Sequence, residues 1–244
     1  MMAYRNSTVQ GRRYTILLTF IFTLTLVLTV WPVSAESEFY QKGLSHYQKG
    51  EFELAIASFE EAKRAEPRNA LIYFYQGNSY YQLNDLDNAI ITFTAGLGYT
   101  EDKGIFFYNL GNCYYLKGNY QFSTEMYDKA LVYDPTLYDS YLNAGNAFYR
   151  AGNYEKTIVR WETYLEKYPE TPQYENIRRA IAYLRGELTG GKGTPSNIDE
   201  TTGLDQDLMD EVMSDLDRLL NSTENIMEKS EKPVDDLSIE GIER

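Results

Sequence analysis

The stretch LGNCYYLKGNY, from Leu110 to Tyr120, has two close counterparts in the chain. YQGNSYYQLND begins at Tyr75, and NAGNAFYRAGN begins at Asn143. Each stretch contains Gly-Asn, one small residue and two aromatic residues, and a polar turn sequence follows about one helical turn later. This recurrence predicts one structural unit that is used several times.

The repeated unit has a fixed length. Its glycine recurs every 34 residues, at Gly43, Gly77, Gly111 and Gly145. Aromatic residues recur four positions before each glycine, four after it and sixteen after it, the last set being Phe59, Phe93, Tyr127 and Trp161. Within each unit the apolar and small residues follow helical spacing, which predicts two helices per unit. Gly118-Asn119 and Gly152-Asn153 are expected to form turns between the two helices.

A 34-residue period with this arrangement of glycine and aromatic residues resembles the tetratricopeptide repeat family over residues 36–171. The resemblance implies an all-α fold, a right-handed solenoid of helix–turn–helix units that stabilise one another by stacking. We expect a domain at 36–189 with four units, at 36–69, 70–103, 104–137 and 138–171. A capping helix is expected at 173–188, with an outer face formed by Glu175, Arg178, Arg179 and Arg185.

The repeated glycine is expected to let the two helices of a unit approach closely. The aromatic residue sixteen positions later is expected to fill the space between units. The second unit departs from the pattern, with Gly96 where alanine would serve and Glu101 where the other units have proline. We therefore expect a looser second helix in this unit and an altered joint near 96–104.

The N-terminal segment, residues 1–35, contains three arginines and no acidic residue. An apolar run and Val33-Ser34-Ala35 follow, an order typical of a secretory signal peptide. The run is also close to the ~20 residues that span a bilayer. A cleaved signal and an uncleaved anchor over 14–31 therefore both stay open, and both predict export to the periplasm or cell envelope of a bacterium.

The C-terminal segment, residues 190–244, holds 15 acidic and 5 basic residues, a net charge of −10, and no aromatic residue follows Tyr183. It is interpreted as an acidic linker and disordered tail without a core of its own. The formal charge of the whole chain is −13, which argues against a nucleic-acid partner.

Residues 204–220 of the tail form an amphipathic pattern, in which only Asp205 and Asp215 share the apolar arc. We expect this helix to dock on the chain's own groove, on a partner or on a second copy. A transient helix in a solvated tail is the alternative. The apolar arc consists of Leu204, Leu208, Met209, Val212, Met213, Leu216, Leu219 and Leu220.

The sequence predicts no enzyme, no metal site and no cofactor. His46 occupies a position that is aromatic in the other units, and Cys113 occupies a position of small residues, so both are expected to be packing residues. One histidine and one cysteine cannot form a common zinc site or a Cys-His dyad.

The resemblance implies a concave groove, lined by the first helix of each unit, that commonly holds a peptide. One position after each glycine stand Leu44, Asn78, Asn112 and Asn146, which are expected to point into the groove. A carboxamide both donates and accepts, so three of them can bind a peptide backbone as a ladder. An aromatic wall is expected from Tyr40, Phe74, Tyr108, Tyr47, Tyr81, Tyr115 and Tyr149. Arg150 is the cation expected near the groove, and the alternative is that these asparagines and tyrosines mainly fill helix and core positions.

The sequence therefore predicts a non-catalytic scaffold or adaptor of the cell envelope that binds a peptide or partner protein in its concave groove. The alternative is a self-assembling structural protein, in which the 204–220 helix docks on its own or another copy's repeat surface. Contact with a membrane is expected only through the N-terminal segment.

Overall fold

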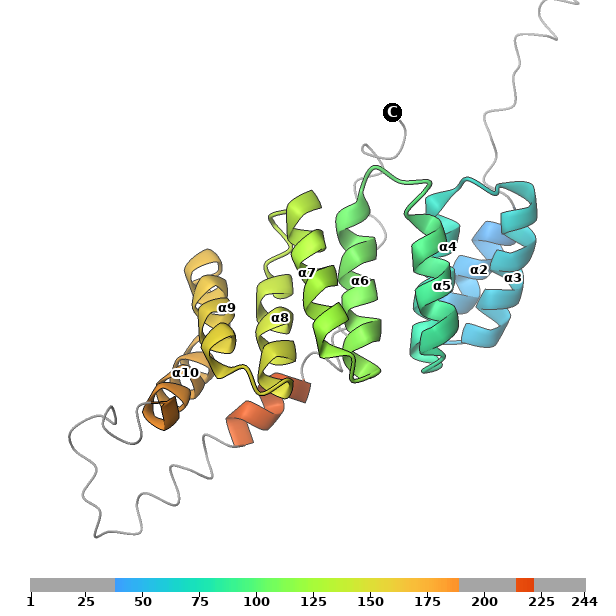
Figure 1. The fold of residues 1–244 in the computed structure, drawn as a ribbon. Coiled ribbons are helices and arrows are strands. Elements are labelled where there is room, and N and C mark those ends of the chain that lie inside the picture. The colour runs from blue at the N-terminus through green and yellow to red at the C-terminus, as the bar shows by residue number, and fades with distance from the viewer. Residues whose placement is uncertain (1–37, 189–213, 222–244) are drawn as a thin grey trace, which may run out of the picture.

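The computed structural model describes residues 38–188 and 214–221 of the chain (Figure 1). Every regular element within these residues is a helix. In order, the helices of the first range are α2 (Glu38–Gln48), α3 (Phe52–Ala65), α4 (Ala70–Gln82), α5 (Leu86–Gly96), α6 (Lys103–Leu116), α7 (Tyr120–Tyr133), α8 (Asp139–Arg150), α9 (Tyr154–Lys167) and α10 (Tyr174–Leu188). The all-helical solenoid expected from the repeats is confirmed.

The helices form four pairs that stack side by side (Figure 1). In each pair the second helix packs on the first, and in the first three pairs it also packs on the first helix of the following pair. The first helices α2, α4, α6 and α8 contact one another in series. This places them on the inner face of the array.

The turns inside the pairs use a left-handed backbone conformation. Gly50, Gly118 and Gly152 have φ values of 74°, 71° and 73°, and Asn84 takes this role in the second unit with φ 56°. Glycine adopts positive φ without the steric cost of a Cβ atom, and asparagine tolerates it better than most residues. In three of the units the residue after this position caps the following helix. The side chains of Asp85, Asn119 and Asn153 accept a hydrogen bond from the backbone N–H three residues later. The turns expected at Gly118-Asn119 and Gly152-Asn153 are confirmed.

The repeated glycine and the aromatic residue sixteen positions later are in direct contact. A Cβ atom added at Gly111 would lie 2.5 Å from Cε1 of Tyr127, and one added at Gly145 would lie 2.4 Å from Cδ1 of Trp161. The other two units repeat this arrangement with phenylalanine. The ring was expected to fill the space between units; the structure shows in addition that each ring packs on the glycine of its own unit.

The joint after the second unit is tight rather than loose. Helix α5 ends at Gly96, and a Cβ atom there would lie 2.4 Å from Cε1 of Phe106 and 2.9 Å from Cβ of Tyr73. Phe106 of α6 therefore enters the space that a side chain at position 96 would occupy. The expectation of an altered joint agrees with the structure, because α5 ends at Gly96 and residues 97–102 separate it from α6. The expectation of a looser second helix does not, because the end of α5 is closely packed.

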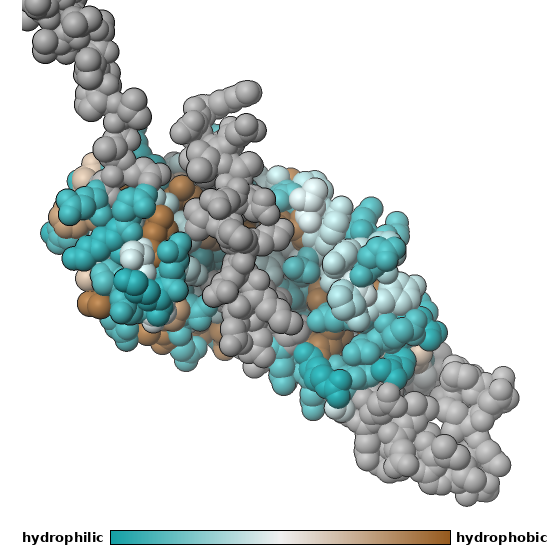
Figure 2. Space-filling view, turned by 180° about the vertical axis from the view of Figure 1, so that it is seen from behind, coloured by the Kyte–Doolittle hydropathy of each residue, from teal (hydrophilic) through white to brown (hydrophobic). Residues whose placement is uncertain are grey.

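Helix α10 covers the end of the fourth pair by packing on α9 (Figure 1). Seen from behind, most of the coloured surface is hydrophilic, with smaller apolar patches between the polar groups (Figure 2). No helix within residues 38–188 and 214–221 combines the length and apolarity needed to cross a membrane. The segment 14–31, expected to be a signal or anchor, lies outside the described residues.

Candidate peptide-binding groove

Asn146 of α8 is held in one orientation by Trp161 of α9. Nε1 of Trp161 donates to Oδ1 of Asn146 over 2.9 Å, and both side chains are completely buried. An indole N–H only donates, so the carbonyl end of the Asn146 amide must face the ring. The amide nitrogen is thereby aimed elsewhere, and it donates to the backbone oxygen of Leu219 over 3.0 Å.

Asn112 of α6 has the same support one unit earlier. The hydroxyl of Tyr127 donates to Oδ1 of Asn112 over 2.7 Å. The amide of Asn143 donates to the same oxygen over 3.4 Å. Nδ2 of Asn112 is buried and has no hydrogen-bond partner within the described residues. Asn112 is therefore a second oriented donor on the inner helices.

Asn78 of α4 differs from these two. The residue sixteen positions after its glycine is Phe93, which has no polar atom to orient an amide. Oδ1 of Asn78 accepts instead from Nδ2 of Asn109 over 3.4 Å, a bond that joins α4 to α6. The three asparagines share one spacing and are all buried, yet only two of them are oriented by an aromatic donor.

Residues 214–221 form a short helix, here called the tail helix, beside α8 and α10 (Figure 1). Asp215, Leu216, Leu219 and Leu220 are between 1% and 5% exposed, whereas the other four residues are exposed. One face of the tail helix is thus buried and the other is open to solvent, as expected for an amphipathic helix. The rest of the helix predicted over 204–220, residues 204–213, lies outside the described residues.

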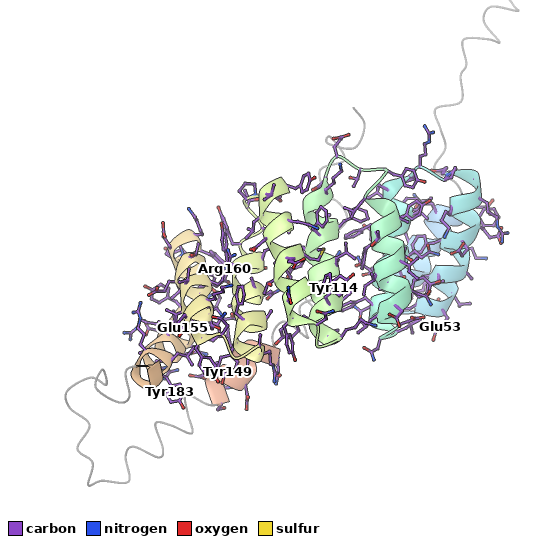
Figure 3. All side chains as sticks on the ribbon, viewed as in Figure 1. Glu53, Tyr114, Tyr149, Glu155, Arg160 and Tyr183 are labelled. Carbon is purple, nitrogen blue, oxygen red and sulfur yellow. The ribbon has the colours of Figure 1, made fainter. Side chains whose placement is uncertain are left out.

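The leucines of the tail helix are part of the apolar core at the end of the array. They belong to one cluster with Leu142 of α8, Trp161 of α9 and the α10 residues Ile177, Ala180, Ile181 and Leu184. Tyr149 and Tyr183 pack against the same cluster, and both lie close to the tail helix in Figure 3. Burial of three leucines contributes about 1.5–3 kcal/mol each before the entropy of ordering the tail is subtracted.

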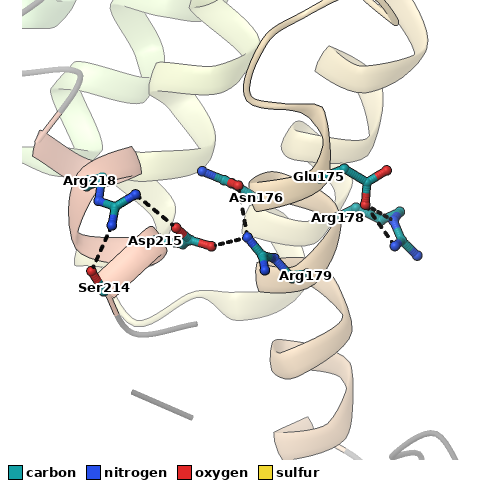
Figure 4. A network of polar contacts seen from close by, with 7 residues as sticks. All are labelled: Glu175, Asn176, Arg178, Arg179, Ser214, Asp215 and Arg218. Atoms are coloured by element: carbon teal, nitrogen blue, oxygen red, sulfur yellow. Dashed lines mark hydrogen bonds and ion pairs between the residues drawn. The ribbon is translucent and has the colours of Figure 1, made fainter. Parts of the chain in front are cut away.

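Asp215 is paired with Arg179 of α10 (Figure 4). Nη2 of Arg179 lies 2.5 Å from Oδ2 of Asp215, and it also donates to Oδ1 of Asn176 over 3.1 Å. Arg218 reaches the other oxygen of Asp215 over 3.4 Å. Arg179 was expected on the outer face of the capping helix, but it faces the tail helix because an acidic residue on the buried arc of that helix needs a cationic partner.

Tyr115 and Arg150 complete this region. The Tyr115 hydroxyl donates to the backbone oxygen of Leu220 over 3.4 Å, and Nε of Arg150 donates to that hydroxyl over 3.4 Å. We use the name tail-helix site for Tyr115, Asn146, Arg179 and the apolar cluster around the leucines. Its polar groups come from the inner helices α6 and α8 and from the capping helix α10, so the tail helix contacts all three.

The other aromatic residues expected in the groove wall are divided between core and surface. Tyr40 is 2% exposed and packs between Phe59 and Tyr75, so it is a core residue. Tyr108 is also buried, against Tyr127, and burial raises the pKa of its phenol. Tyr81 is buried as well. Phe74, Tyr47 and Tyr149 are partly buried, and Tyr149 stacks on Trp161.

The residues considered for catalysis are engaged in packing or local pairing. Nδ1 of His46 lies 2.6 Å from Oε2 of Glu51. Cys113 is fully buried, and burial raises the pKa of its thiol to about 12. In the part of the chain that the structure describes, no group of three or more His, Cys, Asp or Glu side chains is placed to hold a metal ion.

Comparison with known families identifies the class of protein that this fold represents. Family models described as tetratricopeptide repeat match residues 40–104, 105–137 and 139–171, which together make up more than half of the chain. The chain belongs to the tetratricopeptide repeat family. Domains of this class are protein-interaction scaffolds.

Similar solved structures include MamA proteins. A crystal structure of MamA protein is 17% identical, covers 79% of this chain and 93% of that one, and has a TM-score of 0.56. The fragment of MamA from residue 41 to the end, from Desulfovibrio magneticus RS-1, is 17% identical, covers 75% and 98% of the two chains, and also has a TM-score of 0.56. At this identity the likeness shows the fold alone. No curated protein matches the chain.

Proposed function

We propose that this protein is a non-catalytic adaptor of the cell envelope, whose inner face binds a peptide or helix of a partner protein. The observation that carries the proposal is the bond from Nδ2 of Asn146 to the backbone oxygen of Leu219. An inner-face side chain thus already binds main chain that belongs to a separate helical segment. Such a contact depends on the backbone of the ligand and suits a general peptide-binding surface.

Further groups support this binding mode. Asn112 presents a second buried amide donor without a partner in the described ranges, and Tyr115 donates to a neighbouring carbonyl. Beside them, Tyr149 is partly buried and Arg150 is exposed. One such hydrogen bond contributes only about 0.5–1.5 kcal/mol, so selectivity must come from the apolar contacts and the charges around it.

Photo-crosslinking from the inner face tests the proposal. The photoreactive amino acid p-benzoylphenylalanine would replace Tyr149, and in a matched control it would replace Val132, which is 78% exposed on α7. We expect irradiation of cells to link a partner protein to the Tyr149 variant and not to the control. Crosslinking from Val132 alone, or from neither position, would contradict binding on the inner face.

The envelope location rests on residues 1–35, where basic residues precede an apolar run. Expression in a bacterium should place the chain outside the cytoplasm. Protease added to the cells should then digest it once the outer membrane or cell wall has been permeabilised. Deletion of residues 1–35 should keep it inside. Equal protection of both forms would reject the proposed location.

Self-assembly is the second candidate function, and the docked tail helix favours it specifically. The same contacts can form between copies if the tail helix of one chain occupies the site of another. Sedimentation velocity over a hundredfold range of concentration would then show growth of the particle. A constant monomer would exclude self-assembly.

A further inference from the structure

The tail helix meets its site through three kinds of contact, each with a different requirement for the ligand. Three leucines enter the apolar cluster, one acidic side chain pairs with Arg179, and two backbone oxygens accept from Asn146 and Tyr115. From these contacts we infer that the site selects an amphipathic helix with the pattern acid–Leu–x–x–Leu–Leu, and that the partner carries such a helix. This inference rests on the proposed function and names the class of ligand.

The spacing of the buried residues defines the apolar part of the pattern. Leu216, Leu219 and Leu220 are 1%, 3% and 2% exposed, whereas Asp217 and Arg218 between them are exposed. Positions i, i+3 and i+4 lie on one face of a helix. The two exposed positions between them lie off the apolar face and can vary more in a ligand than the three leucine positions, although Arg218 also reaches Asp215.

The acidic residue fixes the charge of the ligand. Asp215 is 5% exposed, so its carboxylate needs a partner in the protein, and Arg179 supplies it over 2.5 Å. Replacing the acid with a neutral or basic residue would leave Arg179 facing an apolar or repulsive neighbour. The residue before the first leucine must therefore be acidic.

The polar contacts also fix the direction of the ligand. Asp215, at the start of the tail helix, lies at α10, Leu219 contacts Asn146 of α8, and Leu220 contacts Tyr115 of α6. The ligand runs from the capping helix toward the earlier repeats. A helix inserted in the opposite direction would place its acid far from Arg179.

The chain's own tail helix competes with a partner for this site. Residues 189–213 join α10 to the tail helix in the sequence, so the tail helix binds its site within the same chain, at an effective concentration on the order of 1 mM. A partner must therefore bind the site strongly enough to displace this intramolecular competitor. Binding of the partner releases the tail.

Titration of a peptide into the full chain tests this inference. The labelled peptide would contain residues 213–222, and the protein would carry Leu216→Asp and Leu219→Asp, which release its own tail helix. We expect fluorescence polarisation to show saturable binding to this opened chain and about tenfold weaker binding to the unmodified chain, owing to the tethered competitor. Equal binding to both chains would show that the tail helix and the peptide use different sites, which overturns the inference.

A charge exchange tests the acidic position. Arg179→Glu in the opened chain should weaken binding of the natural peptide about tenfold, and a peptide with Asp215→Arg should recover that loss. The recovery cannot arise from a misfolded variant. If both peptides bind the Arg179→Glu chain equally, the site does not recognise the acidic side chain of the ligand.

An amide exchange tests the backbone contact. Asn146→Asp keeps the acceptor for Trp161 and removes the donor to Leu219, so binding should fall about tenfold. Asn109→Asp, which buries a carboxylate at a similar depth outside the tail-helix site, should leave binding within about twofold. Equal losses in both variants would overturn the assignment of Asn146.

The outcomes also separate this inference from the proposed function. If the natural peptide and one with its leucines moved to other positions bind equally, the inner face binds peptides without the inferred pattern. If neither peptide binds the opened chain, the proposed function fails as well. Stable dimers of opened and unmodified chains in sedimentation would identify a second copy as the ligand and overturn the assignment to a partner.

Discussion

Nε1 of Trp161 lies 2.9 Å from Oδ1 of Asn146, and this bond determines which end of the Asn146 amide faces the tail helix. Tyr127 performs the same task for Asn112 over 2.7 Å. In the first two units the equivalent aromatic residue is Phe59 or Phe93, which cannot donate. The last two units therefore differ chemically from the first two, although all four share one fold.

Asn146→Asp is expected to release the tail helix while the solenoid stays folded. The carboxylate still accepts from Trp161 but repels the oxygen of Leu219. Hydrogen exchange of the amides of residues 214–221 should become about tenfold faster, corresponding to a loss of roughly 1.4 kcal/mol. Unchanged exchange in 214–221 would show that the leucines alone hold the helix.

Gly111→Leu is expected to destabilise the array strongly, because its Cβ atom would overlap the Tyr127 ring. We expect a loss of about 3 kcal/mol in urea unfolding. Gly118→Ala serves as the control, since it has positive φ but no atom within 4 Å of the added Cβ, and should cost only about 1 kcal/mol. Comparable losses in the two variants would refute the close-approach explanation.

Tyr127→Phe is expected to convert the third unit to the chemistry of the second. Oδ1 of Asn112 would lose its shorter hydrogen bond, at a cost of about 0.5–1.5 kcal/mol, because Asn143 still donates to this oxygen. Thermal unfolding followed by circular dichroism measures this loss. Combining Tyr127→Phe with Asn112→Leu should recover part of it, because the second change removes the buried polar group.

The stability of the protein is expected to fall at alkaline pH. Burial raises the pKa of Cys113 to about 12, so the folded chain keeps this proton after the unfolded chain, with a thiol pKa near ~8.5, has lost it. The stabilisation is complete below the unfolded pKa and decreases by up to about 1.4 kcal/mol per pH unit above it.

Cys113→Ala should remove this part of the pH dependence, as measured by urea unfolding between pH 7 and pH 10. The buried tyrosines, whose pKa values are also raised, will still contribute above the ordinary tyrosine range. A native thiol that reacts with a thiol reagent as fast as the unfolded chain would contradict the burial of Cys113.

The repeats, their turns and the all-helical fold could be predicted because a 34-residue period imposes the same local pattern four times. The tight joint at Gly96 could not, because it depends on Phe106, a residue of the next helix. Sequence spacing predicts the helix face on which a residue lies. The packing at a joint depends on which side chain of the neighbouring helix contacts that residue.

The sequence predicted on which helix face the candidate residues lie, but not which side chains they contact. The offset from the glycine identified Asn112 and Asn146, yet it treated Asn78 as equivalent, because only the three-dimensional packing shows which aromatic residue faces each amide. The pairing of Asp215 with Arg179 was missed. The available signal was the presence of Asp215, one of two acids on the apolar arc of the tail pattern, because a buried carboxylate requires a cation on the surface that it contacts.

The bond between Trp161 and Asn146 also gives the molecule an optical reporter. Trp161 is one of two tryptophans in the chain, the other being Trp31 in the N-terminal segment. A Trp31→Phe chain would emit from Trp161 alone, an indole whose hydrogen-bond acceptor holds the backbone of the tail helix. Departure of that helix would admit water near the ring and shift its emission to longer wavelength, so displacement of the tail can be followed in real time without an attached dye.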